Sequence, residues 1–408
     1  MSRRVVITGM GGVTALGQDW LTVEKKLREG ENAVRYMESY ALFDGLNTKL
    51  AAPITDFEVP KHYTRKQLRA MGRVSKLATV ASENALTQAG LLGNTILTNG
   101  STGIAYGSSV GSTPAIGAFG TMLNDKTTKE ITATTYVQMM PHTAAVNVGL
   151  FFGLRGRVIP TSSACTSGSQ AIGYAYEAIK HGYQTVMVAG GAEELCPTES
   201  AVFDTLFATS LKNDAPKTTP RPYDTDRDGL VIGEGAGSLV LEEYQHALDR
   251  GATILAEVVG FATNCDATHI TQPQQQTMQQ CMTMALQQAQ LQPQDIDYIS
   301  AHGTATEKGD IAESQATANI FGNQTPISTL KSYFGHTLGA CGAIEAWLSI
   351  EMMNNGWFNP SLNLDTPDPR CGELDYIQGQ GRNIDCRYIM SNNFAFGGIN
   401  TSLIFKRL

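Results

Sequence analysis

The junction between an expected strand and an expected helix at residues 158–182 reads "VIPTSSACTSGSQAIGYAYEAIKHG". Its first residues are apolar and predict a short strand. Apolar residues then recur at helical spacing from 171 to 179, and Lys180, His181 and Gly182 are typical of a helix end. Between the two elements lies Cys165, within a run of serine, alanine, threonine and glycine.

Cys165 is therefore expected at the N-terminus of the helix, with its side chain exposed. There the free backbone N–H groups and the helix dipole favour a thiolate and lower the pKa of the thiol. The small neighbouring residues would let a substrate backbone approach closely. Taken alone, the segment fits a nucleophilic cysteine and a buried structural thiol equally well.

Outward from this junction, strand-like runs and helical patterns alternate along the chain, which predicts an α/β fold with buried strands. Strand-like runs at residues 4–9, 102–109 and 184–194 flank helical patterns such as 75–91. After about residue 250 a similar order begins again, from "ATILAEVVGFAT" at 252–263 to "AIEAWLSIEMMNNG" at 343–356. We expect two related halves, residues 1–250 and 251–408, within one body.

The composition excludes several classes of protein. A net charge of −8 over 408 residues argues against nucleic-acid binding. The apolar start turns polar too soon for a secretory signal, and no apolar stretch is long enough to cross a membrane. Seven cysteines without CxxC pairs indicate reduced thiols in a cytoplasmic protein. The glycine-rich "GMGGVTALG" at 9–17 does not complete a dinucleotide-binding fingerprint, so a tight turn is the better interpretation.

Two histidines in the second half join Cys165 as candidates. His302 lies in "ISAHGTATEKGD" at an expected strand end, and His336 lies in "TLKSYFGHTLGACGAIEA", five residues after Lys331. A cysteine protease needs one histidine and an orienting amide or carboxylate, and a zinc site would show ligands at short set spacings, which are not seen. Two neutral imidazoles beside a thiolate could donate two Nε2–H hydrogen bonds to one developing oxyanion, which suits an enolate formed from a thioester.

Five motifs now carry a resemblance to a known family. They are "SSACTSGSQAIGYA" (162–175), "RPYDTDRDGLVIGEGAG" (221–237), "AHGTATEKGD" (301–310), "KSYFGHTLGACGAIE" (331–345) and "NNFAFGGIN" (392–400). In this order and spacing the chain resembles the β-ketoacyl-acyl-carrier-protein synthases of the I/II type, over essentially its whole length. The resemblance implies a thiolase-like fold, two pseudo-related halves forming layered αβαβα, and assembly as a dimer.

The resemblance also implies the chemistry. An acyl group would move from the phosphopantetheine arm of an acyl carrier protein to Cys165. Malonyl on a second carrier protein would lose its carboxyl group, and the enolate would attack the acyl thioester to give a β-ketoacyl chain two carbons longer. No metal and no bound cofactor would be needed, because the substrates are carried on phosphopantetheine.

Residue roles follow from the resemblance position by position. His302 and His336 would stabilise the enolate, and Lys331 would orient the site through polar contacts with Glu345. The backbone N–H groups of Cys165 and Phe396 would form the oxyanion hole, with the Phe396 ring as a gate. The remaining expected roles are pantetheine binding (Thr304, Thr306, His269, Thr271), the acyl pocket (Val110) and a basic patch for the acidic carrier protein (Arg65, Lys66, Arg69, Arg73). Within the patch, Arg65, Arg69 and Arg73 are expected roughly on one helical face.

Departures from the family pattern bear on the pathway. The expected glycine-rich gate loop carries Ala395 and Ile399, and "FATSLKND" at 207–214 lacks an arginine that the housekeeping enzyme often shows. These features favour a specialised type II polyketide or polyene pathway, with the housekeeping synthase II of fatty-acid elongation as the alternative. The partner would be a second copy or a chain-length-factor-like homologue.

Three other functions are disfavoured. A non-catalytic chain-length partner would usually lack the nucleophile, whereas Cys165 and both histidines are present. A thiolase would use a second cysteine late in the chain, and Cys341 lies in a helix-like stretch outside a thiolase-type motif. A hydrolase would need a water-activating carboxylate, and none stands beside Cys165 in the sequence.

Overall fold

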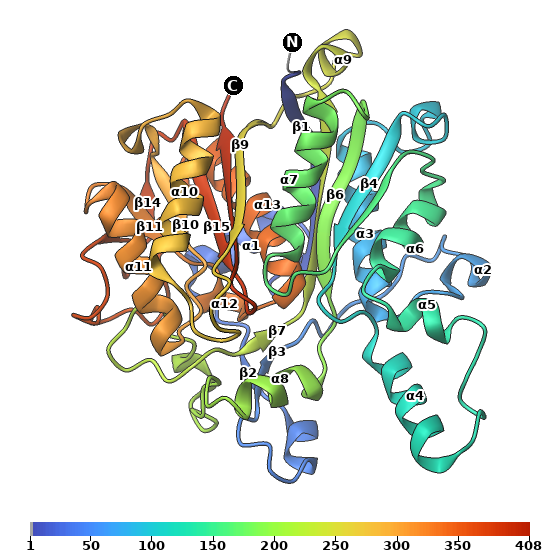
Figure 1. Ribbon diagram of the computed structural model, residues 1–408, viewed down its shortest axis with the longest axis horizontal. Coiled ribbons are helices and arrows are strands. Elements are labelled where there is room, and N and C mark those ends of the chain that lie inside the picture. The colour runs from blue at the N-terminus through green and yellow to red at the C-terminus, as the bar shows by residue number, and fades with distance from the viewer. Residues whose placement is uncertain (1–2) are drawn as a thin grey trace.

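The computed structural model describes residues 3–408 and shows two halves joined side by side (Figure 1). The first half contributes five strands to the main sheet, in the order β5 (Val158–Thr161), β4 (Thr102–Gly107), β6 (Val186–Glu193), β8 (Gly235–Glu243) and β1 (Val5–Thr14). The second half continues from β1 with β9 (Ala256–Cys265), β16 (Ile399–Lys406), β15 (Tyr388–Phe394), β10 (Tyr298–Ser300), β11 (Pro326–Ser328) and β13 (Asp375–Tyr376).

The two halves repeat the same pairing scheme. In the first, β1 is antiparallel to β8, β8 is antiparallel to β6, and β6, β4 and β5 are parallel. In the second, β9 is antiparallel to β16, β16 is antiparallel to β15, and β15, β10 and β11 are parallel. The halves join where residues 5–7 of β1 pair with residues 256–258 of β9. This internal repeat, which the sequence showed only as a pattern, places the two sets of strand ends around one centre.

Helices form the other layers. The middle layer consists of α7 (Ser167–Lys180) and α13 (Cys341–Asn355), which contact each other and strands of both halves. On the outside, α3 (Arg73–Gln88) and α6 (Thr143–Phe152) cover the first half, whereas α10 (Gln275–Ala289), with α11 (Glu307–Phe321) beside it, covers the second. The predicted αβαβα layering is therefore confirmed.

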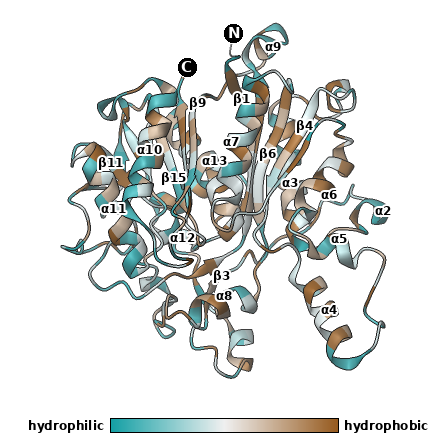
Figure 2. Cartoon of the chain, in the orientation of Figure 1, coloured by the Kyte–Doolittle hydropathy of each residue, from teal (hydrophilic) through white to brown (hydrophobic). Residues whose placement is uncertain are grey.

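The central strands and the helix α13 are almost completely buried. All ten residues of β1 and all eight of β6 are buried, and hydrophobic residues gather along β1, β4 and β6 in Figure 2. Twelve of the fifteen residues of α13 are buried, because α7 and strands of both halves pack against this helix. The sheet and α13 thus form a rigid frame for the loops that follow their ends.

The remaining elements complete the fold. The helices are α1 (Trp20–Arg28), α2 (Arg65–Leu68), α4 (Thr113–Asp125), α5 (Thr135–Met139), α8 (Pro197–Asp204), α9 (Tyr244–Asp249) and α12 (Lys331–Phe334). Two small sheets contain β2 (Arg35–Tyr36), β3 (Leu50–Ala52) and β7 (Ile232–Gly233), and β12 (Trp357–Phe358) with β14 (Arg382–Asn383). Single 3-10 turns lie at Glu38–Leu42, Thr95–Leu97, Pro216–Thr218, Pro293–Asp295 and Leu338–Ala340.

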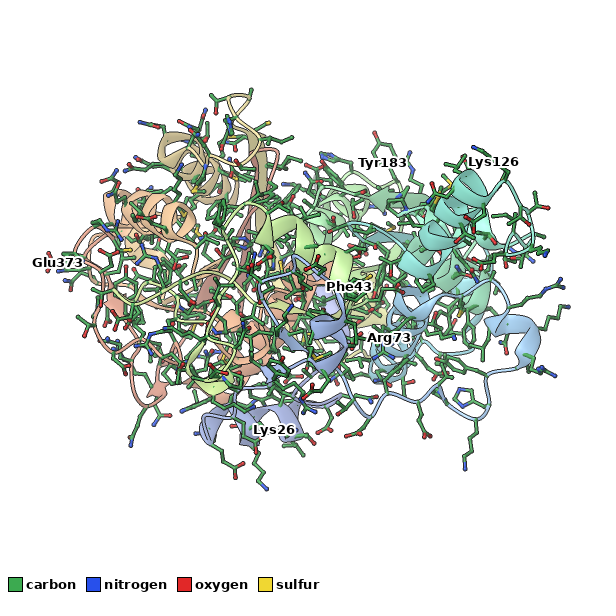
Figure 3. All side chains as sticks on the ribbon, turned by 90° about the horizontal axis from the view of Figure 1, so that it is seen from below. Lys26, Phe43, Arg73, Lys126, Tyr183 and Glu373 are labelled. Atoms are coloured by element: carbon green, nitrogen blue, oxygen red, sulfur yellow. The ribbon has the colours of Figure 1, made fainter. Side chains whose placement is uncertain are left out.

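One segment projects from this body. Helices α4 and α5 extend away from the sheet in Figure 1, and Lys126, directly after α4, lies at the edge of the view in Figure 3. Within residues 3–408, no helix is both long and apolar enough to cross a membrane.

Candidate active site

Cys165 lies where the sequence predicted it, between β5 and α7, in a sharp turn. The preceding Ala164 has φ +51°, a left-handed conformation that costs a residue with a Cβ about 1 kcal/mol or more. The turn is held by local hydrogen bonds, including Ser167 Oγ to the Ala164 carbonyl at 2.7 Å. This strained turn directs the Cys165 side chain towards the loops of the second half.

The expected exposure and acidity of Cys165 are both wrong. The residue is only 4% exposed, because loops from the second half cover it. Burial raises the pKa of the thiol to about 11, and this outweighs the Lys331 ammonium and the backbone N–H groups of Phe396 and Cys165, which lower it. Hence the free enzyme holds a neutral thiol, and the helix terminus alone does not produce a thiolate.

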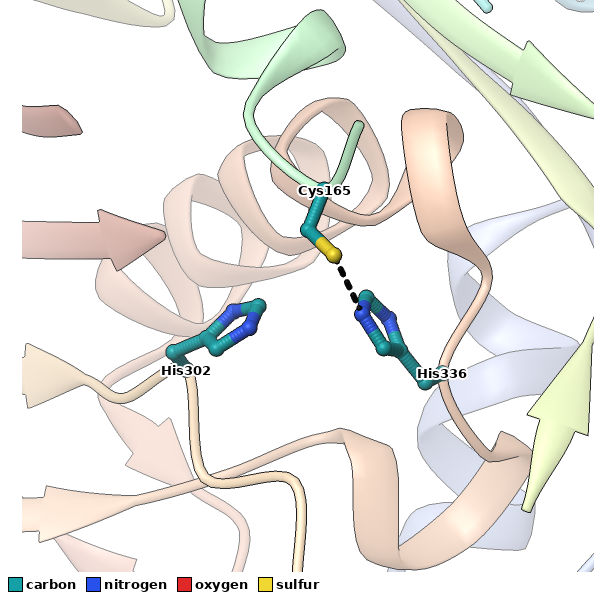
Figure 4. Close-up of side chains that lie close together, drawn as sticks. All are labelled: Cys165, His302 and His336. Atoms are coloured by element: carbon teal, nitrogen blue, oxygen red, sulfur yellow. Dashed lines mark hydrogen bonds between the residues drawn. The ribbon is translucent and has the colours of Figure 1, made fainter. Parts of the chain in front are cut away.

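His302 and His336 lie in two loops of the second half and approach this thiol (Figure 4). His336 Nε2 lies 2.9 Å from Cys165 Sγ. The two imidazole rings are nearly perpendicular, with centroids 5.2 Å apart, and a ring nitrogen of each lies within 4.8 Å of the sulfur and of the other. The sequence predicted this grouping from the position of both histidines at the ends of elements.

The hydrogen bonds of the two rings fix which nitrogen carries the proton. His336 Nδ1 accepts from the Leu338 backbone N–H at 3.3 Å, and His302 Nδ1 faces the Asn393 Nδ2 donor at 3.4 Å. Burial, reinforced by the Lys331 charge, lowers the pKa of both histidines well below the usual value, so both are neutral at pH 7. A neutral imidazole that accepts at Nδ1 donates from Nε2. Both rings thus carry their proton on Nε2. The Nε2 of His336 faces the Cys165 sulfur, and a ring nitrogen of His302 lies within 4.8 Å of it.

A buried polar chain orients His302. Lys331 forms an ion pair with Glu345 Oε1, and Glu345 Oε2 accepts a 2.7 Å hydrogen bond from Asn393 Nδ2, the group that also faces His302. Lys331 and Glu345 do not line the cavity. The expected contact between Lys331 and Glu345 is therefore present, and the chain reaches the imidazole through Asn393. The sequence analysis did not single out Asn393, although it lies within the quoted "NNFAFGGIN".

Backbone contacts hold both histidines in place. The His302 and Gly303 N–H groups donate to Glu313 at 2.7 and 2.8 Å, and burial raises the pKa of this carboxyl to about 7. The His336 N–H donates to the Val231 carbonyl at 2.7 Å, which ties the loop to β7. Nothing in the sequence pointed to Glu313, which lies in α11, three residues beyond the quoted motif that contains His302.

A cavity of about 530 Å³ leads from the surface to Cys165, His302 and His336. Among its walls are the four residues expected to bind pantetheine and the expected gate, namely Thr304, Thr306, His269, Thr271 and Phe396. The gate loop is tied to the opposite wall, because the Gly397 N–H donates to the Ile270 carbonyl at 2.8 Å.

One expected residue does not lie as predicted. Arg73 does not share a helical face with Arg65 and Arg69, because α2 ends at Leu68 and a separate helix, α3, begins at Arg73. Its guanidinium pairs with Glu234 at 2.7 Å and is half-buried, whereas the other three basic side chains are exposed. Val110 sits in the turn after β4, outside the lining of this cavity, and its role in an acyl pocket stays a prediction.

The other cysteines are free thiols, and one touches the site. Cys341 begins α13, and its Sγ lies 3.2 Å from the Cys165 carbonyl oxygen. It therefore contacts the backbone of Cys165 while remaining outside the cavity lining. The group formed by Cys165, His302 and His336 is also a set of donors that zinc accepts, which the sequence spacing could not reveal.

Comparison with known proteins places this fold and site in one class. The profile "Beta-ketoacyl synthase, N-terminal domain" matches residues 2–247, and "Beta-ketoacyl synthase, C-terminal domain" matches residues 255–365. The chain belongs to the beta-ketoacyl synthase family, and it is an acyltransferase of that kind.

Individual relatives match over the whole length. The 3-oxoacyl-(acyl-carrier-protein) synthase 2 of Synechocystis sp. is 35% identical over 411 residues, covering 99% of this chain and 98% of the relative. A beta-ketoacyl synthase from Burkholderia phymatum STM815 has a solved structure that is 60% identical, with a TM-score of 0.99 and full coverage of both chains. A type II polyketide ketosynthase, solved with its acyl-carrier protein, is 30% identical with a TM-score of 0.88 and full coverage of both.

Proposed function

We propose that the chain catalyses a decarboxylative Claisen condensation on Cys165, using malonyl-acyl carrier protein as the extender. The observation that carries this proposal is the pair of neutral imidazoles, each of which has a ring nitrogen within 4.8 Å of the Cys165 sulfur. Such a pair can donate two hydrogen bonds to a single enolate oxygen. The proposal assigns no metal and no bound cofactor, and its substrates are carried on phosphopantetheine.

The first step transfers the acyl group. The Cys165 sulfur attacks the carrier thioester carbonyl, and the new S–C bond forms as the carrier C–S bond breaks. The thiol proton leaves Cys165 and ends on the released carrier thiol. The backbone N–H groups of Cys165 and Phe396, which face the sulfur, would stabilise the tetrahedral oxyanion.

The second step makes and uses the enolate. The malonyl C–C bond breaks and releases carbon dioxide, and its electron pair forms an enolate whose oxygen accepts from His302 and His336. The enolate carbon attacks the Cys165 acyl thioester and forms the new C–C bond. The Cys165 thiolate leaves and regains a proton, and the product is a carrier-bound β-ketoacyl chain two carbons longer.

The expected roles outside the reacting atoms remain part of the proposal. Thr304, Thr306, His269 and Thr271 line the cavity and would contact the pantetheine arm. The exposed Arg65, Lys66 and Arg69 would attract the acidic carrier protein, without Arg73.

A dimer partner has a suitable surface. Strand β5 is the last strand of the main sheet, and its Val158 is 49% exposed. Open sheet edges attract further strands, so natural proteins cover or protect them. The neighbouring α4 and α5 expose Leu123 and Tyr136. We infer that a second copy or a chain-length-factor-like homologue covers this edge.

The pathway is tested with carrier-bound substrates. The enzyme, alone and with candidate partner subunits, is given saturated, polyunsaturated and aryl-starter acyl carrier proteins plus malonyl carrier protein, and the products are identified by mass spectrometry. We propose a specialised type II polyketide or polyene pathway, which predicts products from conjugated or aryl chains or only with a partner. Efficient extension of saturated chains by the enzyme alone would instead indicate fatty-acid elongation.

A further inference from the structure

A buried carboxylate with no counter-ion lies next to the site. Glu193 ends β6 and is 0% exposed. Its Oε1 accepts from Ser108 Oγ at 2.8 Å and from the Val110 N–H at 3.4 Å, and its Oε2 accepts from the Ser109 N–H at 2.7 Å and the Gly339 N–H at 3.0 Å. Within residues 3–408, no lysine, arginine or histidine forms an ion pair with it. Burial raises the pKa of this carboxyl, and the hydrogen-bond donors, which favour the ionised form, oppose that rise.

The four donors belong to two separate loops. Ser108, Ser109 and Val110 form the turn after β4, whereas Gly339 lies three residues after His336. The approach at Gly339 is tight, because a Cβ on it would lie 2.7 Å from Glu193 Oε2. The carboxylate therefore holds the loop that carries His336 against the turn that contains Val110.

The same charge acts on the reacting thiol. Burial is the largest cause of the raised pKa of Cys165, and the Glu193 charge adds a smaller effect in the same direction, against Lys331. The other groups facing the thiol are His302 and His336, both neutral, and the Cys341 thiol contacts the carbonyl oxygen of Cys165. Two further carboxyls, Glu194 and Glu199, are also buried; burial first and the Glu193 charge second raise the pKa of Glu199.

We propose that Glu193 is a positioning residue, which joins the turn at 108–111 to the His336 loop and imposes its negative charge on Cys165. This inference rests on the proposed function for the roles of Cys165 and His336. Glu193 does not line the cavity and would not touch substrate, so it would act only through the residues that it holds in place.

The adjacent Glu194 supplies a matched control. It is 3% exposed and is also saturated by hydrogen bonds, but its donors are the Val74 N–H at 3.1 Å and the Thr113 N–H and Oγ1 at 2.8 Å, with Ser112 Oγ nearby. These contacts hold the starts of α3 and α4 and do not reach the His336 loop. Replacing it also removes a buried charge and buried hydrogen bonds, at a site that does not face Cys165.

The test compares Glu193→Gln, Glu193→Asp and Glu194→Gln in the full chain, with folding checked by thermal melting. The first readout is the rate at which iodoacetamide alkylates Cys165 as a function of pH, measured by peptide mass spectrometry. The second is kcat and KM for condensation. Alkylation of Cys165 needs neither carrier protein nor malonyl. It therefore tests the effect of Glu193 on the thiol even if the enzyme does not catalyse the proposed condensation.

Loss of charge and loss of position give different results. Glu193→Gln moves the pH profile of Cys165 alkylation to lower pH, so that the alkylation rate at pH 8 rises roughly three- to tenfold. The same variant lowers kcat by roughly 10- to 100-fold with little change in KM. Glu193→Asp keeps the charge and the profile but lowers kcat, because the shorter side chain cannot reach both loops. Glu194→Gln leaves the profile unchanged.

Three results would overturn the inference. They are an unchanged profile in Glu193→Gln, an equal shift in Glu194→Gln, or full kcat in Glu193→Asp. If Glu193→Gln does not fold, the Glu193→Asp kcat decides the positioning role.

Discussion

Replacing Lys331 with methionine tests the buried chain that leads to His302. The ammonium of Lys331 and the carboxylate of Glu345 are 1% and 0% exposed, and they pair with each other. Without the ammonium, Glu345 keeps a single hydrogen bond from Asn393. Removing one partner of a buried pair leaves an uncompensated charge, which costs about 3–5 kcal/mol of the free energy of unfolding.

The pH dependence of this loss has a definite sign. Burial already raises the pKa of Glu345, and without Lys331, which lowers it, the pKa in the folded state rises further above the unfolded value. A group whose folded pKa is raised binds its proton more tightly when folded, so it stabilises the fold at low pH and loses that contribution as pH rises. The Lys331→Met variant should therefore be closest to wild type near pH 5 and furthest from it near pH 8–9.

The assay is urea unfolding followed by tryptophan fluorescence, since the buried Trp347 lies in the same helix as Glu345. The double variant Lys331→Met with Glu345→Gln removes both charges and should recover about 2–4 kcal/mol of the loss, because apolar or neutral replacements of buried pairs are often tolerated. A loss below about 1 kcal/mol at pH 8, a loss that shrinks as pH rises, or a double variant no more stable than the single one would refute this account.

Three further predictions concern the thiol and the surface. Because burial raises the pKa of Cys165 to about 11, its alkylation rate should rise about tenfold per pH unit from 7 to 10; a plateau below pH 8 would contradict this. Reversing the exposed charges of Arg65, Lys66 and Arg69 to glutamate should raise KM for carrier-bound acyl chains about tenfold or more, and KM for a small acyl-pantetheine thioester little; equal effects on both substrates would exclude a docking role. Phe207 lines the cavity, is 91% exposed and has φ +53°, a conformation that favours glycine. Phe207→Gly should therefore stabilise the protein by about 0.5–1 kcal/mol, measured by thermal melting. A lower melting temperature would show that the Phe207 side chain stabilises the fold.

Local patterns determined much of what the sequence could predict. The strand and helix around Cys165 follow from apolar spacing within 25 residues, and they form at Val158–Thr161 and Ser167–Lys180. His302 and His336 could be predicted to meet because each lies at the end of an expected element in the second half. In the structure the strands that precede them, β10 and β11, are neighbours in the sheet. Periodicity and element ends are short-range signals that a single sequence carries.

The errors and omissions concern long-range contacts. Arg73 was assigned to the basic patch, but its partner Glu234 lies 161 residues away, and nothing local marks that pairing. The exposure of Cys165 was wrong for the same reason, since the loops that bury it come from the other half of the chain. Glu193 gave only a weak signal, an acidic pair at the end of an apolar run, and its role depends on Gly339, 146 residues further on.

The most direct test of the central claim is the mass of the intact enzyme after incubation with acyl carrier protein thioesters. The account predicts that wild-type enzyme gains the mass of one acyl group on Cys165, and that malonyl carrier protein then removes it with release of carbon dioxide and a chain two carbons longer. Cys165→Ala should stay unmodified. If no acyl group appears on Cys165 for any chain, alone or with a partner subunit, the cysteine is not the nucleophile and the proposed reaction is wrong.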